Sequence, residues 1–434
     1  MIAKTTVIKD VYNLTKSLPT RVVTKPEFVY IATDNARCTL KELYIKEGEK
    51  VKLNQVIGMR DGKFFEQPIH STVSGTFIGL EKHFHRSGKE VNYIKIKNDF
   101  KDEFDESRKE RSDEEILKLT KEDMTEIVKN CSSVGLGGSS FPTYIKFQTN
   151  DPIEYVLINA VECEPYLTAD HRICAEFGYQ IMDGIKYIMQ AFKAKKCLIC
   201  IKEKYHDLND IFNGLINATG AENVEVCRVG NFYPQGWEIK MIESALGIKI
   251  PSGILPSKYG IIDFNVSTVL GIWRAIKWNE SVYDRNVTIT GNGIKSPQNF
   301  RVRVGTALKD ILPYCNGYVD ESPKEIIVGG PMMGVSSVTE DIILTKTVTA
   351  IIIMNHENYI EEPCVRCGSC VYSCPCGLQP VQIMNAVKAM NKEKMFALGC
   401  NKCIECGLCT YSCTSKIKVT DYVRRAKIFT RGMK

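Results

Sequence analysis

Short apolar stretches separated by turn-forming residues mark the first hundred positions of the chain. Between residues 28 and 98, stretches rich in β-branched and aromatic residues are separated by Gly, Asn, Asp and Lys. These stretches read FVYIATDN, LKELYI, VKLNQVIGM, STVSGTFIGL and VNYIKIKN. The pattern predicts a small β domain over residues 28–98. The dense mixed-charge run that follows, NDFKDEFDESRKERS, indicates a solvated linker or the start of a helix.

The next part of the chain alternates between helical and strand patterns. SDEEILKLTKEDMTEIVKNC predicts a helix that Ser112 caps, because acidic residues and apolar positions at helical spacing follow it. Further helices are predicted at IMDGIKYIMQAF, NDIFNGLINAT, GWEIKMIESALG and VSTVLGIWRAI, and strands at YVLINA, KCLICIK and VEVCRVG. Strands separated by helices imply a parallel, Rossmann-like sheet over residues 112–280.

A new unit is predicted from about residue 285. VTITGNGIKSPQNFRVRV contains two β-rich runs around a Gly-Asn-Gly turn, and a helix is expected after Val304-Gly305-Thr306. IIVGGPMMGV follows at residues 326–335. As chemistry, this segment indicates only a tight turn with apolar filling residues.

The cysteines of the C-terminal segment carry the strongest chemical signal. CVRCGSCVYSCPCG and CNKCIECGLCTYSC repeat one spacing, which places Cys364, Cys367, Cys370 and Cys374 in register with Cys403, Cys406, Cys409 and Cys413. In such doubled signatures three thiolates bind one [4Fe–4S] cluster and the fourth binds the other. We therefore expect Cys413 to join the first three cysteines and Cys374 to join Cys403, Cys406 and Cys409. Zinc also binds paired Cys-x2-Cys motifs, but it rarely needs three evenly spaced cysteines plus a fourth, twice.

Composition and charge narrow the class of protein. A chain of 434 residues with 44% hydrophobic and 25% charged residues predicts about three folded domains without global disorder. The net charge of +6 comes without a basic groove interleaved with aromatic residues, so nucleic acid is not an expected partner. The charged N-terminus does not resemble a secretory signal, and no apolar run reaches the roughly 18 residues of a membrane span. We expect a soluble cytoplasmic chain, whose 18 cysteines then favour metal binding over disulfides.

Several residues with suggestive chemistry have simpler explanations. His83 and His85 are expected at the surface beside a turn. Cys197 and Cys200 are expected as buried strand cysteines, and Cys376 and Cys400 as packing residues beside the clusters. The C-terminal helix VTDYVRRAKIFTRGMK is basic and amphipathic, and two interpretations stay open for it. It is either a solvated face or a surface for an acidic ferredoxin or an anionic membrane.

A second chemical signal lies in VGLGGSSFPTYIKF, residues 134–147, and in the strand that follows it. Gly135, Gly137 and Gly138 let backbone N–H groups approach a phosphate or a flat ring, and Lys146 can neutralise charge. A glycine run alone is also typical of an ordinary turn. Polar side chains then follow the strand YVLINA, at the edge where open α/β sheets bind ligands. These side chains are Asn159, Glu162 and Glu164.

Together these two segments resemble the flavin- and NADH-binding region of the complex I flavoprotein subunit. There, a GRGGAGFPTG-type loop precedes an Asn-x-x-Glu-x-Glu-Pro motif. The chain is more similar still to the C subunit of the Rnf ferredoxin:NAD oxidoreductase, of which Gly-Gly-Pro-Met-Met-Gly is characteristic. In addition, IKEGEKVKLNQVIG and PIHSTVSGTFIG resemble the halves of a biotinyl/lipoyl-type barrel-sandwich hybrid, without the carrier's lysine motif. The unit after residue 285 resembles the β-grasp SLBB domain.

The resemblance implies a multidomain α/β and α+β architecture. Its parts are a barrel-sandwich hybrid at 28–98, a Rossmann-like FMN/NADH domain at 112–280, an SLBB domain at 285–350 and a dicluster ferredoxin domain at 360–434. It implies that an FMN and nicotinamide pocket is lined by Gly135, Gly137, Gly138, Lys146, Asn159, Glu162 and Glu164. Within it, Glu162 and Glu164 would orient nicotinamide or ordered water. Tyr233, Gln235 and Gly236 match a turn of relatives that faces the nucleotide.

The implied function is electron transfer among NAD(H), FMN and two [4Fe–4S] clusters. The implied partners are Rnf membrane subunits, a ferredoxin or a cytoplasmic reductase, with peripheral attachment to the inner face of the cell membrane in the first case. Two alternatives stay open. One is a soluble electron donor similar to the electron-transfer protein of proline reductase or to cobalamin reductase. The other is a flavin-free protein that conducts electrons through its two clusters.

Three departures from the family pattern bear on these expectations. Leu136 stands where complex I has arginine, as in the Rnf branch. Ser139 and Ser140 replace Ala-Gly, and a serine would shift or exclude the flavin ring if only glycine fits there. The N-terminal segment lacks the Gly-Gly-x-His-Pro motif of Rnf C subunits, which bears on docking to the other subunits.

Overall fold

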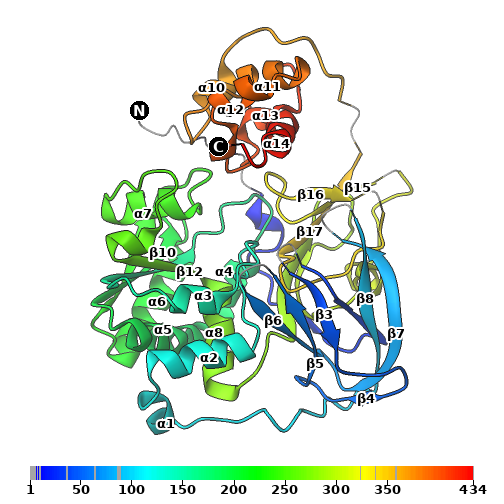
Figure 1. The fold of residues 1–434 in the computed structure, drawn as a ribbon, viewed down its shortest axis with the longest axis vertical. Coiled ribbons are helices and arrows are strands. Elements are labelled where there is room, and N and C mark those ends of the chain that lie inside the picture. The colour runs from blue at the N-terminus through cyan, green and yellow to red at the C-terminus, as the bar shows by residue number, and fades with distance from the viewer. Residues whose placement is uncertain are drawn as a thin grey trace.

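A computed structural model describes residues 6, 8, 11–35, 38–62, 65–85, 89–322, 324–337, 339–356 and 359–433. Figure 1 shows the α/β unit beside the strands of the first β unit and the unit with β15–β17. The helices of the cysteine-rich segment lie at one end, above α7 and the β15–β16 hairpin. This arrangement places the cysteine-rich segment where it meets two other units.

The first unit consists of two antiparallel sheets around one apolar core, as the alternating pattern predicted. The sheet orders are β2-β8-β7-β4 and β3-β5-β6. Residues such as Val29, Ile57 and Ile94 fill the space between the sheets. The strands are β2 (Phe28–Ala32), β3 (Thr39–Leu43), β4 (Lys50–Val51), β5 (Val56–Asp61), β6 (Glu66–His70), β7 (Gly75–Phe84) and β8 (Glu90–Asn98).

The expectation of a surface position is wrong for His83. Its side chain is only 7% exposed and lies edge-on to the Tyr30 ring at 4.5 Å. Its Nδ1 lies 2.7 Å from a carboxylate oxygen of Asp341. The residue therefore links the first β unit to a loop more than 250 residues away in sequence, a contact that no local pattern encodes.

The second unit is a four-stranded parallel sheet of order β11-β10-β9-β12, with helices on its faces. This confirms the predicted Rossmann-like alternation. Cys197 and Cys200 are fully buried on β10, also as predicted. The strands are β9 (Tyr155–Ala160), β10 (Lys196–Lys202), β11 (Val224–Val229) and β12 (Ile261–Asn265). The helices are α1 (Asp113–Leu117), α2 (Lys121–Asn130), α3 (Thr143–Phe147), α4 (Ala169–Glu176), α5 (Gly178–Phe192), α6 (His206–Thr219), α7 (Glu238–Leu246), η2 (Pro256–Tyr259) and α8 (Val266–Trp278).

The helix predicted from Ser112 is two helices. Ser112 and Glu115 form a capping box at the start of α1, as the sequence suggested. Thr120 and Asp123 form a second capping box that starts α2. Because a threonine that bonds the N3 amide takes a non-helical conformation, the chain breaks there.

The third unit is a six-stranded sheet of order β1-β14-β13-β17-β15-β16. Its edge strand β1 comes from the N-terminal segment and pairs in parallel with β14. In the sequence, β1 comes before the first and second units, and the other strands of this sheet come after them. The elements are η1 (Tyr12–Leu14), β1 (Arg21–Val23), β13 (Asp284–Thr290), β14 (Gln298–Arg303), α9 (Leu308–Ile311), η3 (Leu312–Cys315), β15 (Lys324–Val328), β16 (Val335–Ser337) and β17 (Ala350–Asn355).

The cysteine-rich unit repeats one local structure twice. A glycine with positive φ precedes a one-turn helix in each repeat: Gly368 precedes the helix that carries Cys370, and Gly407 the helix that carries Cys409. A longer helix then follows, and the two longer helices share a buried core with Ile383 and Val423. The elements are α10 (Ser369–Tyr372), α11 (Pro380–Lys388), α12 (Lys392–Ala397), η4 (Cys400–Lys402), α13 (Leu408–Tyr411) and α14 (Val419–Phe429). In the part of the chain that the structure describes, no helix has the length and apolar character of a membrane span.

Candidate functional site

The glycine loop is closed upon itself and fixed to helix α8. The amide of Gly135 donates to the carbonyl of Phe141 at 2.8 Å, and the amide of Ser140 donates to the carbonyl of Gly135 at 3.1 Å. The amide of Leu136 donates to Thr268 Oγ1 at 2.9 Å. These bonds hold the loop next to the N-terminal end of α8, whose position follows from the strand β12 before it.

Gly137 and Gly138 form the part of the loop that faces the sheet edge. A Cβ at Gly137 would approach the side chain of Asn265 to 3.1 Å, closer than side chains normally pack. Gly138 has a φ of +101°, a conformation that other residues rarely adopt. Asn265 caps α8 through the amide of Ser267 and donates to Asp170 at 2.6 Å. The backbone of Gly137 and Gly138 therefore lies next to Asn265, a polar residue that the sequence had not pointed to.

Lys146 lies between two acids at this edge. Its Nζ is 2.6 Å from Asp263 on β12 and 3.7 Å from Glu238 at the start of α7. Burial alone would raise the pKa of Asp263. The Lys146 ammonium lowers it by more, so the pKa of Asp263 lies below its ordinary value. Burial and the neighbouring Asp263 raise the pKa of Glu238 to about 8. Lys146 is thus the cation of a compact ionic group, whose two acids had no local sequence signal.

Asn159 fixes the loop between β11 and α7. At the carboxyl end of β9, its Nδ2 donates to the carbonyl of Gly236 at 2.9 Å, and its Oδ1 accepts from the amide of Val161 at 3.2 Å. The neighbouring Gln235 is fully buried, and neither its amide oxygen nor its amide nitrogen has a hydrogen-bond partner. Because buried polar atoms normally find partners, this amide indicates a ligand contact.

Glu162 holds the start of helix α4. Its two carboxylate oxygens accept the amides of Asp170 and His171 at 3.0 and 3.1 Å. Burial, and next the charge of Asp170, raise the pKa of Glu162 to about 8. Its carbonyl accepts the hydroxyl of Tyr12 at 3.1 Å, and that hydroxyl in turn accepts a hydrogen bond from Lys202. Tyr12 and Lys202 belong to this buried polar group, and no sequence pattern singled them out.

Glu164 is bound by the Gly-Gly-Pro-Met-Met-Gly turn of the third unit. Its two oxygens accept the amides of Met332 and Met333, each at 3.0 Å, and Tyr233 Oη lies 3.3 Å from one of them. Burial raises the pKa of Glu164 to about 7 despite these donors. A Cβ at Gly330 would collide with the Glu164 carboxylate. The Gly-Gly-Pro-Met-Met-Gly turn, which the sequence indicated only as a tight apolar turn, therefore binds the buried carboxylate of Glu164.

The predicted pocket residues thus gather along one sheet edge. Asn159 lies next to the last residue of β9, Lys146 pairs with Asp263 on β12, and Glu162 and Glu164 occupy the loop after β9. The parallel order brings these carboxyl ends together, as ligand sites in open α/β sheets require. The glycine surface, the unpartnered Gln235 amide and the adjoining cation fit the flat, hydrogen-bonding ring and the anionic tail of an FMN.

The structure brings cysteines of the two motifs together. Cys374, Cys403, Cys406 and Cys409 line one hollow of about 310 Å³, counted with its open side. Burial raises the pKa of Cys406 to about 12, and the thiols of the other three members of the set add to the rise. Around Cys370, the thiols that add to the effect of burial on its pKa are those of Cys413 and Cys364. The fourth cysteine after each motif thus lies with the opposite motif.

Backbone and hydroxyl donors surround the cysteine sulfurs of both sets. The amides of Leu378 and Ile417 lie 3.4 Å from the sulfurs of Cys374 and Cys413, at equivalent places of the two repeats. The hydroxyl of Thr420 lies 3.2 Å from Cys409 Sγ. Such donors stabilise thiolates and tune iron–sulfur clusters. No three His, Cys, Asp or Glu side chains of the described residues are arranged around a single metal ion, and the donor set fits a larger, cysteine-bound group.

The two cysteine sets differ in their surroundings. Cys406 and Cys409 are 7% and 8% exposed, whereas Cys364 and Cys367 are exposed. Cys406 shares a buried apolar cluster with Tyr233, and Cys163 and Met332 pack against that cluster. A Cβ at Gly407 would come within 2.5 Å of the Met332 carbonyl. The set that contains Cys406 therefore lies against the turn that binds Glu164, and the other set faces solvent.

Family models cover three parts of this chain. The "RnfC Barrel sandwich hybrid domain" matches residues 6–101, the "Nuo51 FMN-binding domain" residues 128–274 and the "SLBB domain" residues 286–336. Each match falls on a unit with the corresponding architecture. The solved NAD+-reducing [NiFe]-hydrogenase has a similar chain, with a TM-score of 0.52 at 15% identity over 73% of this chain and 62% of that one. At this identity, the similarity shows the fold alone.

Curated relatives align over most of the chain. The C subunit of the Na(+)-translocating ferredoxin:NAD(+) oxidoreductase complex of Acetobacterium woodii is 34% identical over 85% of this chain and 83% of its own. The C subunit of the proton-translocating ferredoxin:NAD(+) oxidoreductase complex of Clostridium ljungdahlii is 30% identical over 86% and 81%. The C subunit of the ion-translocating oxidoreductase complex of Haemophilus influenzae is 32% identical over 92% of this chain but only 61% of that longer protein.

Proposed function

Because the chain belongs to the Rnf C-subunit family of ferredoxin:NAD(+) oxidoreductase complexes, we propose that it transfers electrons between NAD(H) and an iron–sulfur or membrane partner. The internal route consists of a bound FMN and two [4Fe–4S] clusters. The observation that carries the proposal is the contact between the two sites. The turn that binds Glu164 beside the flavin edge also packs against the loop of the buried cysteine set.

The flavin seat is the carboxyl edge of the parallel sheet. FMN supplies the exchange between hydride transfer and single-electron transfer. Of the three glycines, Gly138 has open space where a Cβ would stand, whereas Ser139 Oγ would collide with a Cβ at Gly135. Gln235 supplies an amide that lacks a protein partner. Lys146 sets a positive charge at this edge, although Asp263 and Glu238 partly neutralise it.

The two serines of the glycine loop place their side chains differently. The side chain of Ser140 lines a cavity on the side of the first β unit, together with Arg60 and Lys346. Ser140 takes a φ of +55°, so it adopts the backbone conformation that glycine favours. Ser139 Oγ folds back toward the amide of Phe141 at 3.4 Å. Ser139 therefore fills the space over Gly135, where its Oγ would collide with a Cβ, but no described residue occupies the corresponding space at Gly138. The open space at Gly138 favours flavin binding over the flavin-free alternative.

Glu162 and Glu164 contribute by position. Hydride transfer to a flavin needs no enzyme base, and both carboxylates already accept two backbone amides. Glu162 orients helix α4, and Glu164 fixes the third unit to the sheet edge. Their raised pKa values, about 8 and about 7, leave each carboxyl partly protonated near neutrality. A protonated oxygen can donate toward nicotinamide or ordered water without loss of the fold.

The cysteine sets provide an inner and an outer electron carrier. The inner set of Cys374, Cys403, Cys406 and Cys409 adjoins the flavin unit, so its burial keeps water from the inner transfer step. The outer set of Cys364, Cys367, Cys370 and Cys413 has exposed members and faces a partner. Ser373 and Ser412, 2.9 Å apart between their hydroxyl oxygens, join the two repeats between the sets.

The exposed face of the C-terminal helix α14 carries less net positive charge than the sequence suggested. Arg424 and Lys427 of α14 both pair with Glu405, so part of the basic helix face is neutralised within the unit. Exposed Tyr359, Val365 and Tyr372 lie near the outer cysteines in sequence and add apolar surface. We assign this face to the membrane subunits of an Rnf-type complex or to ferredoxin, with the chain held peripherally at the membrane.

The test is anaerobic purification with an absorption spectrum and quantitation of iron and flavin. The expected result is about eight irons per chain for two cubes, one flavin released on denaturation, and bleaching of both signals by NADH. Iron without flavin would identify a two-cluster conductor. Flavin and iron without NADH bleaching would point to a soluble donor that receives electrons from another source. Absence of iron would refute the scheme.

A further inference from the structure

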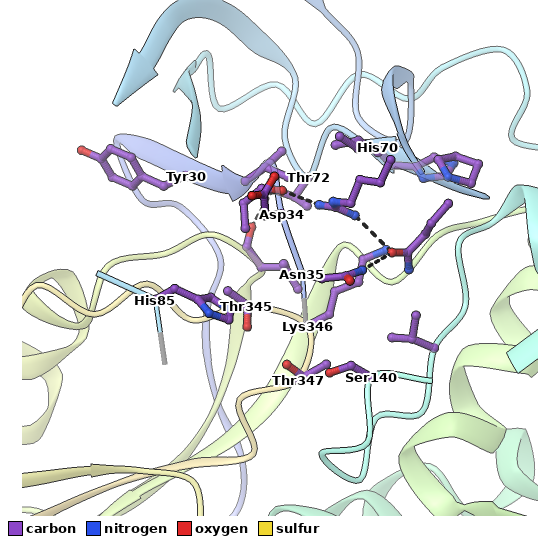
Figure 2. Close-up of a pocket in the computed structure, with 18 residues that line it drawn as sticks. Tyr30, Asp34, Asn35, His70, Thr72, His85, Ser140, Thr345, Lys346 and Thr347 are labelled. Carbon is purple, nitrogen blue, oxygen red and sulfur yellow. Dashed lines mark hydrogen bonds between the residues drawn. The ribbon is translucent and has the colours of Figure 1, made fainter. Parts of the chain in front are cut away.

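A second cavity lies where the first, second and third units meet. It has about 700 Å³ of empty space, counted with its open side. Strands β2, β5 and β6 supply one wall, Val134 and Ser140 of the glycine loop a second, and residues 345–347 a third. In the view of Figure 2, Lys346 lies between Asn35 and Thr347, with Ser140 close to Thr347. None of the flavin-seat residues Asn159, Glu162 and Glu164 lines it.

The cavity wall carries more positive than negative charge. Arg60 is 8% exposed, and its guanidinium donates to the carbonyls of Thr33 and Ala32 and to Gln67, all of them neutral acceptors. Lys346 donates to the Ser132 carbonyl at 3.4 Å. It borders the cavity, and its side chain is half-buried. Burial and next the Arg60 charge lower the pKa of Lys346 to about 7. Two cations are thus held together without an anion between them.

The one acid among the described residues of the wall does not offset these charges. Asp34 accepts the amide of Leu40 at 3.1 Å, and no described ion pair joins it to Arg60 or Lys346. Its charge acts on Arg60 only as a secondary effect, after burial, which lowers the Arg60 pKa to about 10. Buried charges are normally paired, so a net positive wall calls for an anion.

Two further polar groups of the wall have unused hydrogen-bonding atoms. His70 is 6% exposed, and its Nδ1 is buried without a hydrogen-bond partner. Burial lowers the pKa of His70 to about 3, so its ring is neutral. The ring donates to the backbone carbonyl of Asn130, which leaves the unpartnered Nδ1 as an acceptor. The hydroxyl of Thr345, next to Lys346, is likewise buried and unpartnered. Together the wall offers two cations and two neutral hydrogen-bonding groups from separate strands and loops.

We propose that this cavity binds a phosphate group, held by Lys346 and Arg60 and hydrogen-bonded by His70 and Thr345. A phosphate has enough oxygens to meet polar groups from several directions, and a protonated one can also donate, whereas a carboxylate has only two oxygens. Because Ser140 belongs both to this wall and to the glycine loop, an occupied cavity also fixes one end of that loop.

The test is titration calorimetry of the anaerobic holoprotein with inorganic phosphate. We expect one site per chain, and a Lys346→Met variant that binds at least about tenfold more weakly, a difference of about 1.4 kcal/mol. This variant should fold, because it removes one of two like charges. Lys309→Met, at an exposed lysine of the same unit, is the matched control and should bind as the parent does.

The source of the phosphate is decided by parallel titrations with AMP and adenosine. Binding of both phosphate and AMP, dependent on Lys346, supports a site for a free or an esterified phosphate. Binding of AMP alone, with the same dependence, supports a phosphoester ligand. No binding of either probe, equal binding by Lys346→Met, or equal binding of AMP and adenosine would overturn the proposal. Iron, flavin and NADH bleaching are measured separately, so failure here leaves the electron-transfer proposal standing.

Discussion

The carboxylate of Glu164 accepts the backbone amide of Met332 at 3.0 Å, which joins a loop of the parallel sheet to a turn 168 residues later. The same Met332 packs in the cluster that holds Cys406. One hydrogen bond therefore relates the edge where we place the flavin to the buried cysteine set.

Replacement of Glu164 by Gln should weaken this connection. A glutamine has one acceptor oxygen, so one of the two Met332 and Met333 amides would face an NH2 group. A lost hydrogen bond to a charged group is worth roughly 1.5–3 kcal/mol. We expect NADH-dependent reduction of an external iron–sulfur acceptor to slow by about tenfold or more, with flavin content unchanged. Glu222→Gln, at an exposed acid of the second unit, should leave the rate unaltered; an unaltered rate in Glu164→Gln would contradict the role of this anchor.

Stability should depend on pH through Glu164. Its pKa is about 7 in the folded protein and 4.5 in the reference state, so the folded form binds more protons between these values. Stability from this group is complete below the lower value and is lost as pH rises through the higher one, by at most about 1.4 kcal/mol per pH unit. Melting temperatures of parent and Glu164→Gln should thus converge or cross between about pH 5 and about pH 8. A constant difference over this range would count against the raised pKa.

Gly330 should tolerate no side chain. A Cβ there would overlap the Glu164 carboxylate, and neither the buried acid nor the turn backbone can move without loss of the amide contacts. Gly330→Ala should lose about 2 kcal/mol or more of unfolding free energy, the scale of overpacking in a buried site. Gly214→Ala, in helix α6 with open space around the new methyl, should be neutral or stabilising. Chemical denaturation measures the unfolding free energy of both variants. Equal stability of Gly330→Ala and the parent would show that the turn can shift away from the new methyl group.

The two cysteine sets should be separable by mutation. Cys409→Ala removes a ligand of the inner set, and Cys367→Ala one of the outer set, so each should lower iron from about eight to about four per chain. Only Cys409→Ala should also prevent NADH from reducing the remaining cluster, because the inner set lies next to the flavin unit. Cys376→Ala should retain all iron. Electron paramagnetic resonance after NADH addition distinguishes these outcomes, and the reverse pattern would invert the order of the carriers.

Lys146 should govern flavin retention. Lys146→Met would leave Asp263 and Glu238 facing each other without their shared cation. The resulting negative edge should repel the anionic tail of FMN, with at least about tenfold weaker binding, equal to about 1.4 kcal/mol. Fluorescence titration of flavin-depleted protein measures this affinity. The control Lys186→Met, at an exposed position of α5, should bind as the parent does, and equal affinity in both variants would remove Lys146 from the site.

The sequence alone determined the features that depend on local spacing. Apolar periodicity predicted three of the four strands of the parallel sheet, β9, β10 and β11, and the helices α5 to α8, but neither β12 nor α4. Capping residues predicted the start of α1 at Ser112. It missed the break before α2, because the continuous helical pattern masked the second cap at Thr120. The cysteine spacing predicted the crossed grouping by analogy with doubled iron–sulfur signatures, and the structure brings Cys374 together with Cys403, Cys406 and Cys409 in one hollow.

The tertiary structure decided the contacts between residues that are far apart in the chain. The turn at Gly330 read as filling until the structure placed Glu164 in it, and His83 read as exposed until Asp341 was placed beside it. The N-terminal strand β1 joins a sheet whose next strand lies nearly 280 residues later. Contacts of this kind leave no periodic pattern in the sequence, because each residue is polar or small to suit a partner in a different unit. The physical cause is that burial and pairing of charges are settled only when the units pack together.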